Sequence, residues 1–239
     1  MEQNNNKQII GFYPNVQIDE VIKAKIKNND LTFCANYWIT DKGDKYGNKH
    51  GYSYIYENIF KNIKTQQINL LEIGAARGSS LKMWDSWFDN ISIDSLDINK
   101  NCNNLCENYD NINIILTDAK IYVPNKKYDI IIDDGSHLAN DIIMSFHNLW
   151  ESLKIGGIYV IEDMDSCKSI EYIKLFLNNL NENSKYDKNE IDKNTYYYLD
   201  LFINIIKTDT DKNILYHDEK IIFIQKKYKN TDIDIDTIK

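Results

Sequence analysis

The sequence predicts an α/β protein with a doubly wound, mostly parallel seven-stranded sheet that ends in an antiparallel hairpin. From Ile68 onward, apolar runs of strand length alternate with helical patterns, as expected of strands joined by crossover helices. The run 128–134 (YDIIIDD) is rich in consecutive isoleucines, which is typical of a parallel strand covered on both faces. Two β-rich runs within 213–227 flank Asp218 and Glu219, and this pattern predicts the hairpin.

The individual elements follow from the same periodicity. We expect parallel strands at 68–74, 91–98, 112–118, 128–134 and 157–163. We expect helices at 79–88, through 105, and at 140–153, 169–180 and 196–206. Gly156 and Gly157 are predicted to form a turn ahead of the fifth strand. The polar run 181–194 interrupts the alternation and predicts a surface loop.

The chain is predicted to have a helical and loop extension at 1–64, a core domain at 65–228 and a polar tail at 229–239. Within the extension, residues 18–26 form a short amphipathic pattern. Residues 52–60 form a second one, whose apolar side chains recur at helical spacing and predict packing. The glycine-rich, charged loop before it is less easily explained by packing.

Composition limits the partners and the compartment. The net charge of −8 and the isoelectric point near 5.1 argue against nucleic acid, because surfaces that follow phosphates are basic. The four cysteines show neither a zinc-site spacing nor a C-x-x-C pair. There is no apolar run of transmembrane length and no signal-peptide core at the start. We therefore expect a cytoplasmic protein without membrane insertion; the sequence leaves a homo-oligomer open.

A glycine-rich loop, EIGAARGSS, joins the first strand to its helix. Glycines allow a tight turn and a close approach of a ligand, and the helix start offers unpaired N–H groups. The dinucleotide pattern G-x-G-x-x-G is not met, because Ala76 and Ser79 stand at its second and third glycine positions. A nicotinamide or flavin cofactor is therefore disfavoured. The candidate cofactor-binding residues of the loop are Glu72, Gly74, Ala75 and Gly78.

Two acids follow the next two strands. Asp97 lies 19 residues after Gly78 (97 minus 78), where an acid can accept both hydroxyl protons of a ribose. The alternative for Asp97 is a helix N-cap. Asp118 ends the third strand and could accept from an adenine amino group, with capping as an equally good alternative.

The stretch DDGSH, which follows the fourth strand, predicts the reacting half of the site. Asp134 and Asp163 end consecutive strands, and if those strands are neighbours about 4.8 Å apart, both carboxylates can reach one Mg²⁺ ion. The alternative is that Asp163 caps the next helix. His137 lies on the same rim and is a candidate general base, since histidine titrates near neutral pH. A surface role is the alternative for His137 and the preferred interpretation for His147 and His217.

The pattern E-x-G-x-x-x-G, the acids after strands two and three, and the terminal hairpin resemble the class I S-adenosylmethionine-dependent methyltransferases over about residues 65–227. The resemblance implies a Rossmann-like methyltransferase fold with S-adenosyl-L-methionine as cofactor. It places Gly74 and Gly78 at the methionine end, Asp97 at the ribose and Asp118 at the adenine. Asp133 is then a spare carboxylate that faces the cofactor or caps a backbone.

The segments TDK, HGYSYIYE and DDGSH…YVIED resemble a narrower group, the macrocin- and mycinamicin-type sugar O-methyltransferases. This resemblance implies Asp134 and Asp163 as Mg²⁺ ligands, His137 as general base and an acid of the N-terminal extension as third ligand. Glu57 is the closest match for that acid. Met164 stands where catechol-type relatives have an amide ligand, so the third ligand has to come from elsewhere.

We therefore expect a Mg²⁺-dependent O-methyltransferase that acts on the hydroxyl of a nucleotide-linked or glycan-bound sugar, in surface-polysaccharide synthesis or natural-product tailoring. A metal-independent O- or N-methyltransferase would keep the cofactor loop and leave Asp163 as a cap. A non-catalytic glycan-binding protein with the same fold is a further alternative. The sequence does not identify the acceptor, whose pocket we expect to involve residues 34–60 and 181–194.

Overall fold

The computed structural model describes residues 29–46, 49–164, 214–217 and 220–227. The chain divides into two compact units, Met1–Thr117 and Asp118–Lys239. The described residues contain seven strands, three in the first unit and four in the second. None of the helices among these residues is long and apolar enough to span a membrane. The helices expected at 18–26, 169–180 and 196–206, and the loop at 181–194, lie outside the described residues.

The first unit contains three parallel strands: β1 (Gln67–Ile73), β2 (Asn90–Asp97) and β3 (Ile112–Leu116), in the order β3-β2-β1. Most of their central residues are buried, as expected of strands covered on both faces. The predicted strand positions are therefore confirmed here within one or two residues.

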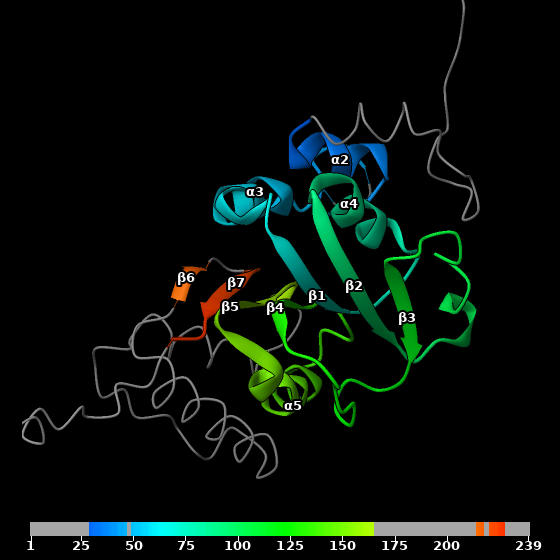
Figure 1. Ribbon diagram of the computed structural model, residues 1–239, viewed down its shortest axis with the longest axis vertical. Coiled ribbons are helices and arrows are strands. Elements are labelled where there is room, and N and C mark those ends of the chain that lie inside the picture. The colour runs from blue at the N-terminus through cyan, green and yellow to red at the C-terminus, as the bar shows by residue number, and fades with distance from the viewer. Residues whose placement is uncertain (1–28, 47–48, 165–213, 218–219, 228–239) are drawn as a thin grey trace, which may run out of the picture. The chain divides into compact units, whose positions relative to one another are not determined.

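Three α-helices belong to this unit: α2 (Leu31–Tyr37), α3 (Tyr52–Phe60) and α4 (Ser79–Trp87). They lie together in Figure 1, and an aromatic cluster joins α3 to α4, with the Tyr56 and Trp84 rings 5.0 Å apart. The predicted packing stripe of α3 is thus confirmed. The unit also has two 3₁₀ turns, η1 (Lys61–Ile63) and η2 (Lys100–Cys102). The second replaces the short helix that was expected to run through residue 105.

The second unit pairs two parallel strands, β4 (Tyr128–Asp133) and β5 (Leu153–Ile161), and adds the antiparallel strands β7 (Ile222–Gln225) and β6 (Ile214–His217) in the order β4-β5-β7-β6. Between β4 and β5 the chain forms α5 (Ala139–Leu149) and the 3₁₀ turn η3 (Trp150–Ser152). The mostly parallel α/β fold with a terminal antiparallel pair, as predicted, is confirmed (Figure 1).

The glycine pair before the fifth predicted strand lies inside β5. The strand begins at Leu153, and its register against β4 shifts between the pairs Tyr128↔Leu153 and Ile130↔Ile158. Gly156 has a φ of 84° and donates its N–H to the carbonyl of Lys226 at 2.6 Å. The predicted turn is therefore wrong: the two glycines form an irregularity within a longer strand.

Candidate active site

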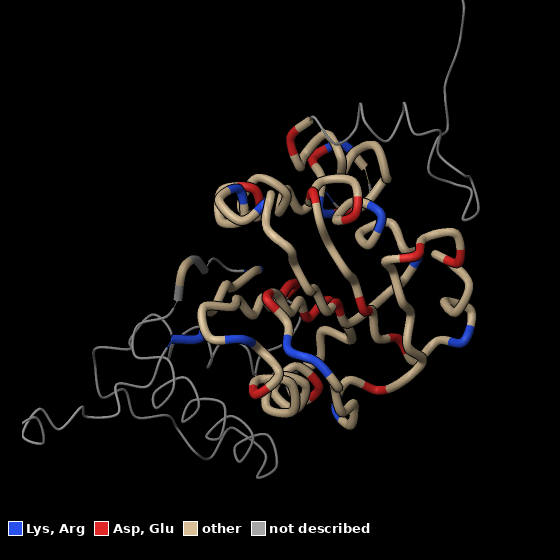
Figure 2. The backbone as a smooth tube through the Cα atoms, in the orientation of Figure 1, with Lys and Arg blue, Asp and Glu red and all other residues tan. Residues whose placement is uncertain are grey.

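The two acids of the predicted metal site follow neighbouring parallel strands. Asp133, the last residue of β4, pairs with Ile161, the last residue of β5. The Glu162 N–H continues this pairing by donating to the Asp133 carbonyl at 2.9 Å. Acidic residues, red in Figure 2, therefore occupy the end of β4 and the positions directly after β5. The condition on which the metal prediction rested, that these strands are neighbours, is confirmed.

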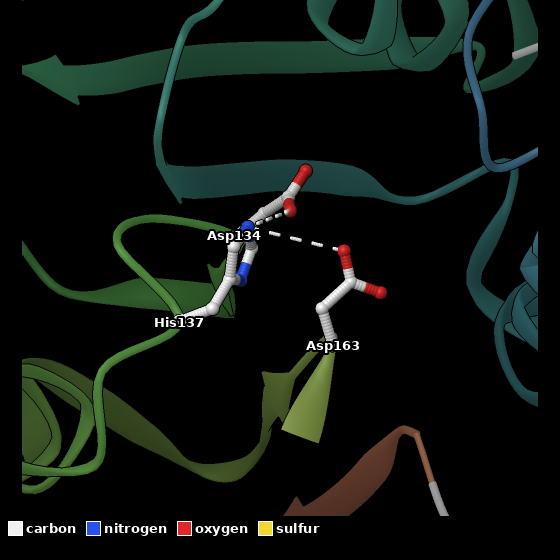
Figure 3. A group of neighbouring side chains, drawn as sticks. All are labelled: Asp134, His137 and Asp163. Carbon is white, nitrogen blue, oxygen red and sulfur yellow. Dashed lines mark ion pairs between the residues drawn. The ribbon is translucent and has the colours of Figure 1, made fainter. Parts of the chain in front are cut away.

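Asp134, His137 and Asp163 converge at this edge of the sheet (Figure 3). The Nε2 atom of His137 lies 3.9 Å from Asp134 Oδ1 and 3.9 Å from Asp163 Oδ2. One potential ligand atom from each residue falls within 4.8 Å of the other two. The side chains are partly exposed: 33% for His137, 21% for Asp134 and 19% for Asp163. An ion or a substrate can therefore reach them from solvent.

Two of these three residues adopt an unusual backbone conformation. His137 has a φ of 57° and Asp163 a φ of 53°, in the left-handed region that residues with a side chain seldom occupy. Such conformations cost of order 1 kcal/mol or more and concentrate at functional sites. Both backbones turn where the chain leaves its strand, and this turn brings the two side chains toward Asp134.

The donor set fits a divalent cation. Mg²⁺ binds oxygen ligands at about 2.1 Å, so two ligands of one ion lie at most about 4.2 Å apart. One oxygen of Asp134 and one of Asp163 lie within 4.8 Å of each other, so at most a small contraction brings the two carboxylates to that limit. Because Mg²⁺ prefers oxygen, the two carboxylates are the natural ligands, which leaves the imidazole of His137 for proton transfer.

The side chain of Asp133, the residue directly before Asp134, is buried. Burial raises the pKa of its carboxyl to about 7, although a hydrogen bond from the Gly135 N–H acts in the opposite direction. That N–H lies 3.4 Å from Oδ1. The hydroxyl of Tyr159 shares the buried environment, and its own pKa is raised well above the usual value by burial and by the Asp133 charge. Of the two roles expected for Asp133, the contact with Gly135 matches the backbone cap.

In the first unit the glycine loop and Asp97 are held together. Asp97 Oδ2 accepts hydrogen bonds from the N–H groups of Ala75 at 2.9 Å and Ala76 at 3.2 Å. Its other oxygen accepts from the Asn99 N–H at 2.7 Å. The N-cap of the following 3₁₀ turn is Asn99, so Asp97 is not that cap. These bonds hold the Asp97 carboxylate against the glycine loop.

The loop also has the backbone that its glycines allow. Gly74 has a φ of 93°, and Gly78, the N-cap of α4, has a φ of 70°. A Cβ on Gly78 would lie 3.1 Å from the sulfur of Cys106, so both conformation and space favour glycine there. Glu72 is fully buried and accepts a 2.7 Å hydrogen bond from the indole N–H of Trp84. That bond ties the end of β1 to α4.

Asp118 lies in the second unit and contacts Lys120. Its Oδ1 accepts from the Lys120 N–H at 2.9 Å, and its Oδ2 lies 3.5 Å from the ammonium of the same residue. The side chain is 40% exposed. The first of these bonds matches the capping alternative, and the exposed carboxylate remains accessible to a ligand.

Glu57, predicted as third ligand, belongs to the first unit. Its Oε2 accepts a hydrogen bond from the Leu31 N–H at 3.1 Å, at the first residue of α2. A carboxylate is favoured there because the helix N-terminus carries a partial positive charge. The group that could hold a cation among the described residues consists of Asp134, His137 and Asp163.

Sequence reasoning passed over two acids of the second unit. Glu162 follows β5 directly and is only 2% exposed. Its signal was visible, because a charged residue at the end of an apolar strand is unusual inside a protein. Asp141, in the first turn of α5, accepts a hydrogen bond from the Ser136 hydroxyl at 2.7 Å. Its partner on the other side is Lys120, 21 positions away, and no local pattern indicates such a contact.

Comparisons with known proteins show which proteins the chain resembles. No protein-family profile matches the chain. It is 36% identical over 121 residues to mycinamicin VI 2''-O-methyltransferase of Micromonospora griseorubida, covering 42% of this chain and 28% of that protein. It is 31% identical over 115 residues to demethylmacrocin O-methyltransferase of Streptomyces fradiae, with the same two shares.

A solved structure is also similar. The MycE methyltransferase from the mycinamycin biosynthetic pathway, in complex with Mg and SAH, matches with a TM-score of 0.60 and 27% identity. The match covers 85% of this chain and 56% of that chain, so the protein spans little more than half of that relative. The resemblance to the macrocin- and mycinamicin-type O-methyltransferases, predicted from the sequence, is therefore confirmed.

Proposed function

We propose that the protein is an S-adenosylmethionine- and Mg²⁺-dependent O-methyltransferase that acts on a sugar hydroxyl. The observation that carries the proposal is the convergence of Asp134, His137 and Asp163 after two neighbouring strands. The similarity to the MycE structure, which holds Mg and SAH, supports both cofactors. The names of the curated relatives support oxygen as the methylated atom. The acceptor would be a nucleotide-linked or glycan-bound sugar.

The chemistry explains why these residue types would be needed. A sugar hydroxyl is a very weak acid, so its attack at neutral pH requires a base for its proton and a Lewis acid near its oxygen. A bound Mg²⁺ ion would supply the Lewis acidity, and Asp134 and Asp163 would hold it. His137 Nε2 would accept the proton, and the carboxylates 3.9 Å away would stabilise the imidazolium that forms.

In the transfer itself, the O–H bond breaks and its proton passes to His137. The oxygen forms a bond to the methyl carbon, and the carbon–sulfur bond breaks with its electron pair going to sulfur. Gly74 and Gly78 would position the methionine end of the cofactor, Asp97 the ribose and Asp118 the adenine. Glu72 and Ala75 would also belong to the cofactor-binding loop, and Asp133 would face the cofactor or cap the backbone.

The domain roles are part of the same proposal. Residues 65–228 would form the catalytic domain, and the extension at 1–64 would contribute the third acid of the metal site. Glu57 remains the proposed residue for that acid. Its bond to the Leu31 N–H is the competing role, because a carboxylate oxygen engaged with a helix start is less available to an ion.

Replacing His137 by Ala tests the proposal. Loss of the base is expected to lower turnover by about 10²- to 10⁴-fold, while the affinity for S-adenosylhomocysteine stays unchanged. Turnover would be measured with radiolabelled methyl donor and a panel of sugar nucleotides and glycosides, and the product analysed by NMR and mass spectrometry. His147→Ala is the matched control, since His147 is exposed on α5.

Three other outcomes would each contradict one part of the proposal. Unchanged turnover in His137→Ala contradicts the base assignment. A product methylated on nitrogen, or on a molecule without a sugar, contradicts the acceptor class. A wild-type protein that binds neither S-adenosylmethionine nor S-adenosylhomocysteine in calorimetry contradicts the enzyme assignment and favours a glycan-binding protein.

A further inference from the structure

The turn that carries His137 needs support, because its backbone is strained. Residues 134–138 link β4 to α5, and His137 lies among them with a φ of 57°. Unless neighbouring contacts stabilise it, a residue with a side chain leaves this conformation readily. A shift of about 1 Å at a catalytic base is enough to reduce turnover strongly.

Ser136 supplies part of that support. Its Oγ donates to Asp141 Oδ2 at 2.7 Å and accepts from the Leu138 N–H at 3.3 Å. The hydroxyl thus joins the residue before His137 to two positions after it: Leu138 and the first turn of α5. Because α5 packs against β5 through Phe146 and Tyr159, the turn is connected to a rigid element.

Lys120 fixes the other side of the Asp141 carboxylate. Its ammonium donates to Asp141 Oδ1 at 2.6 Å, and its N–H is bonded to Asp118. Both side chains are partly shielded, 27% exposed for Lys120 and 29% for Asp141. Burial by itself would raise the pKa of Asp141, but the hydrogen bonds from Lys120 and Ser136 lower it below the usual value. The carboxylate is therefore ionised and held from two directions.

Resting on the function proposed above, we propose that Asp141 is a positioning residue, which holds the Ser136 turn so that His137 stays between Asp134 and Asp163. The Lys120 ammonium keeps Asp141 in place, and the Lys120 backbone N–H donates to Asp118. A Lys–Asp pair at the surface usually contributes little to stability by itself. Here the pair is joined to a strained turn, so its loss displaces His137 from its position beside Asp134 and Asp163.

The test uses Ser136→Ala and Asp141→Ala, with turnover as the main readout and Mn²⁺ alone as the probe of the cation site in electron paramagnetic resonance. A displaced base is expected to lower turnover by up to about 100-fold in both variants. Because His137 is the proposed base and not a metal ligand, the Mn²⁺ affinity should stay near that of the wild type. The turnover number should fall, while the KM for S-adenosylmethionine stays within about twofold. The double variant should be no weaker than the weaker single variant, because both substitutions break one hydrogen bond.

Asp129→Asn is the matched control. Asp129 forms a comparable pair with Lys154, at 2.8 and 2.9 Å, but it lies at the start of β4 rather than at its end. It should keep wild-type turnover. Wild-type turnover in Ser136→Ala, whose side chain is exposed, would overturn the inference. Full turnover in His137→Ala would overturn the base itself and the inference with it, a pattern distinct from the first.

Discussion

At the scale of single residues, Asp133 and Asp134 are adjacent in sequence and opposite in environment. Asp133 is 4% exposed, whereas the Asp134 side chain is 21% exposed and lies 3.9 Å from His137 Nε2. Asp133 is the last residue of the buried strand β4, and Asp134 is the first residue after it. One carboxylate is therefore suited to an ion, and the other to a buried, protonated state.

The buried carboxyl predicts a pH dependence of stability. Burial raises the pKa of Asp133 from 3.8 to about 7, so the folded protein holds a proton there that the unfolded chain releases above about pH 4. Folding is thus destabilised as pH rises from about 4 to about 7, by an amount of order 4 kcal/mol. Asp133→Asn, which resembles the protonated acid, should flatten this slope and raise the unfolding free energy at pH 8.

Urea unfolding at pH 5 and pH 8, in EDTA so that no ion binds at Asp134, measures this effect. Asp129→Asn serves as the control, since Asp129 is paired with Lys154. An Asp133→Asn protein with the same dependence of unfolding free energy on pH as the wild type would contradict the assignment.

At the scale of elements, the start of α4 is the feature that links sequence to cofactor site. Gly78 is its N-cap, with a φ of 70°, and Gly51 is the N-cap of α3, with a φ of 71°. An added Cβ at Gly78 would lie 3.1 Å from Cys106 Sγ, whereas at Gly51 it would meet nothing within 4 Å. Both positions have a positive φ, but only at Gly78 does a neighbouring side chain lie close to the place of an added Cβ.

Alanine at each position separates the two effects. Gly51→Ala should cost about 1–2 kcal/mol of stability through backbone strain alone. Gly78→Ala should cost more stability. It should also weaken S-adenosylhomocysteine binding, because the displaced loop carries the Ala75 and Ala76 N–H groups that hold Asp97, the proposed ribose ligand. Chemical denaturation and calorimetry measure both quantities. Equal stability losses and unchanged affinity in the two variants would contradict a cofactor role for this loop.

Local patterns predicted the strands well. The isoleucines of YDIIIDD predicted β4, and the apolar run before Asp163 predicted the end of β5. The strand ends in turn predicted that Asp134 and Asp163 would meet, since carboxyl ends of neighbouring parallel strands share an edge. Periodicity is enough for these features because they depend on residues close in the chain.

Other features depend on contacts that sequence does not reveal. The start of β5 was misplaced, because Gly156 and Gly157 signal a turn locally but are paired with distant Lys226 in the fold. The bond from Glu57 to Leu31 spans 26 positions, and the bond from Lys120 to Asp141 spans 21. Such contacts are set by the packing of elements, and no local periodicity encodes them.

At the scale of the whole molecule, the charge balance agrees with the chemistry of the proposed ligands. The net charge of −8 favours cations, and both the sulfonium cofactor and Mg²⁺ are cationic. The first unit carries the glycine loop with Asp97, and the second carries Asp118 and the cation group. Each unit thus supplies one part of the proposed machinery.

The central claim is that methyl transfer depends on a cation held at Asp134 and Asp163. Its most direct test is turnover of the protein after exhaustive treatment with EDTA, followed by addition of Mg²⁺, alongside Asp163→Asn. We predict that turnover disappears in EDTA, returns with Mg²⁺ in the wild type, and returns weakly or not at all in Asp163→Asn, which lacks one charged ligand. Full turnover by metal-free protein in EDTA would contradict the claim.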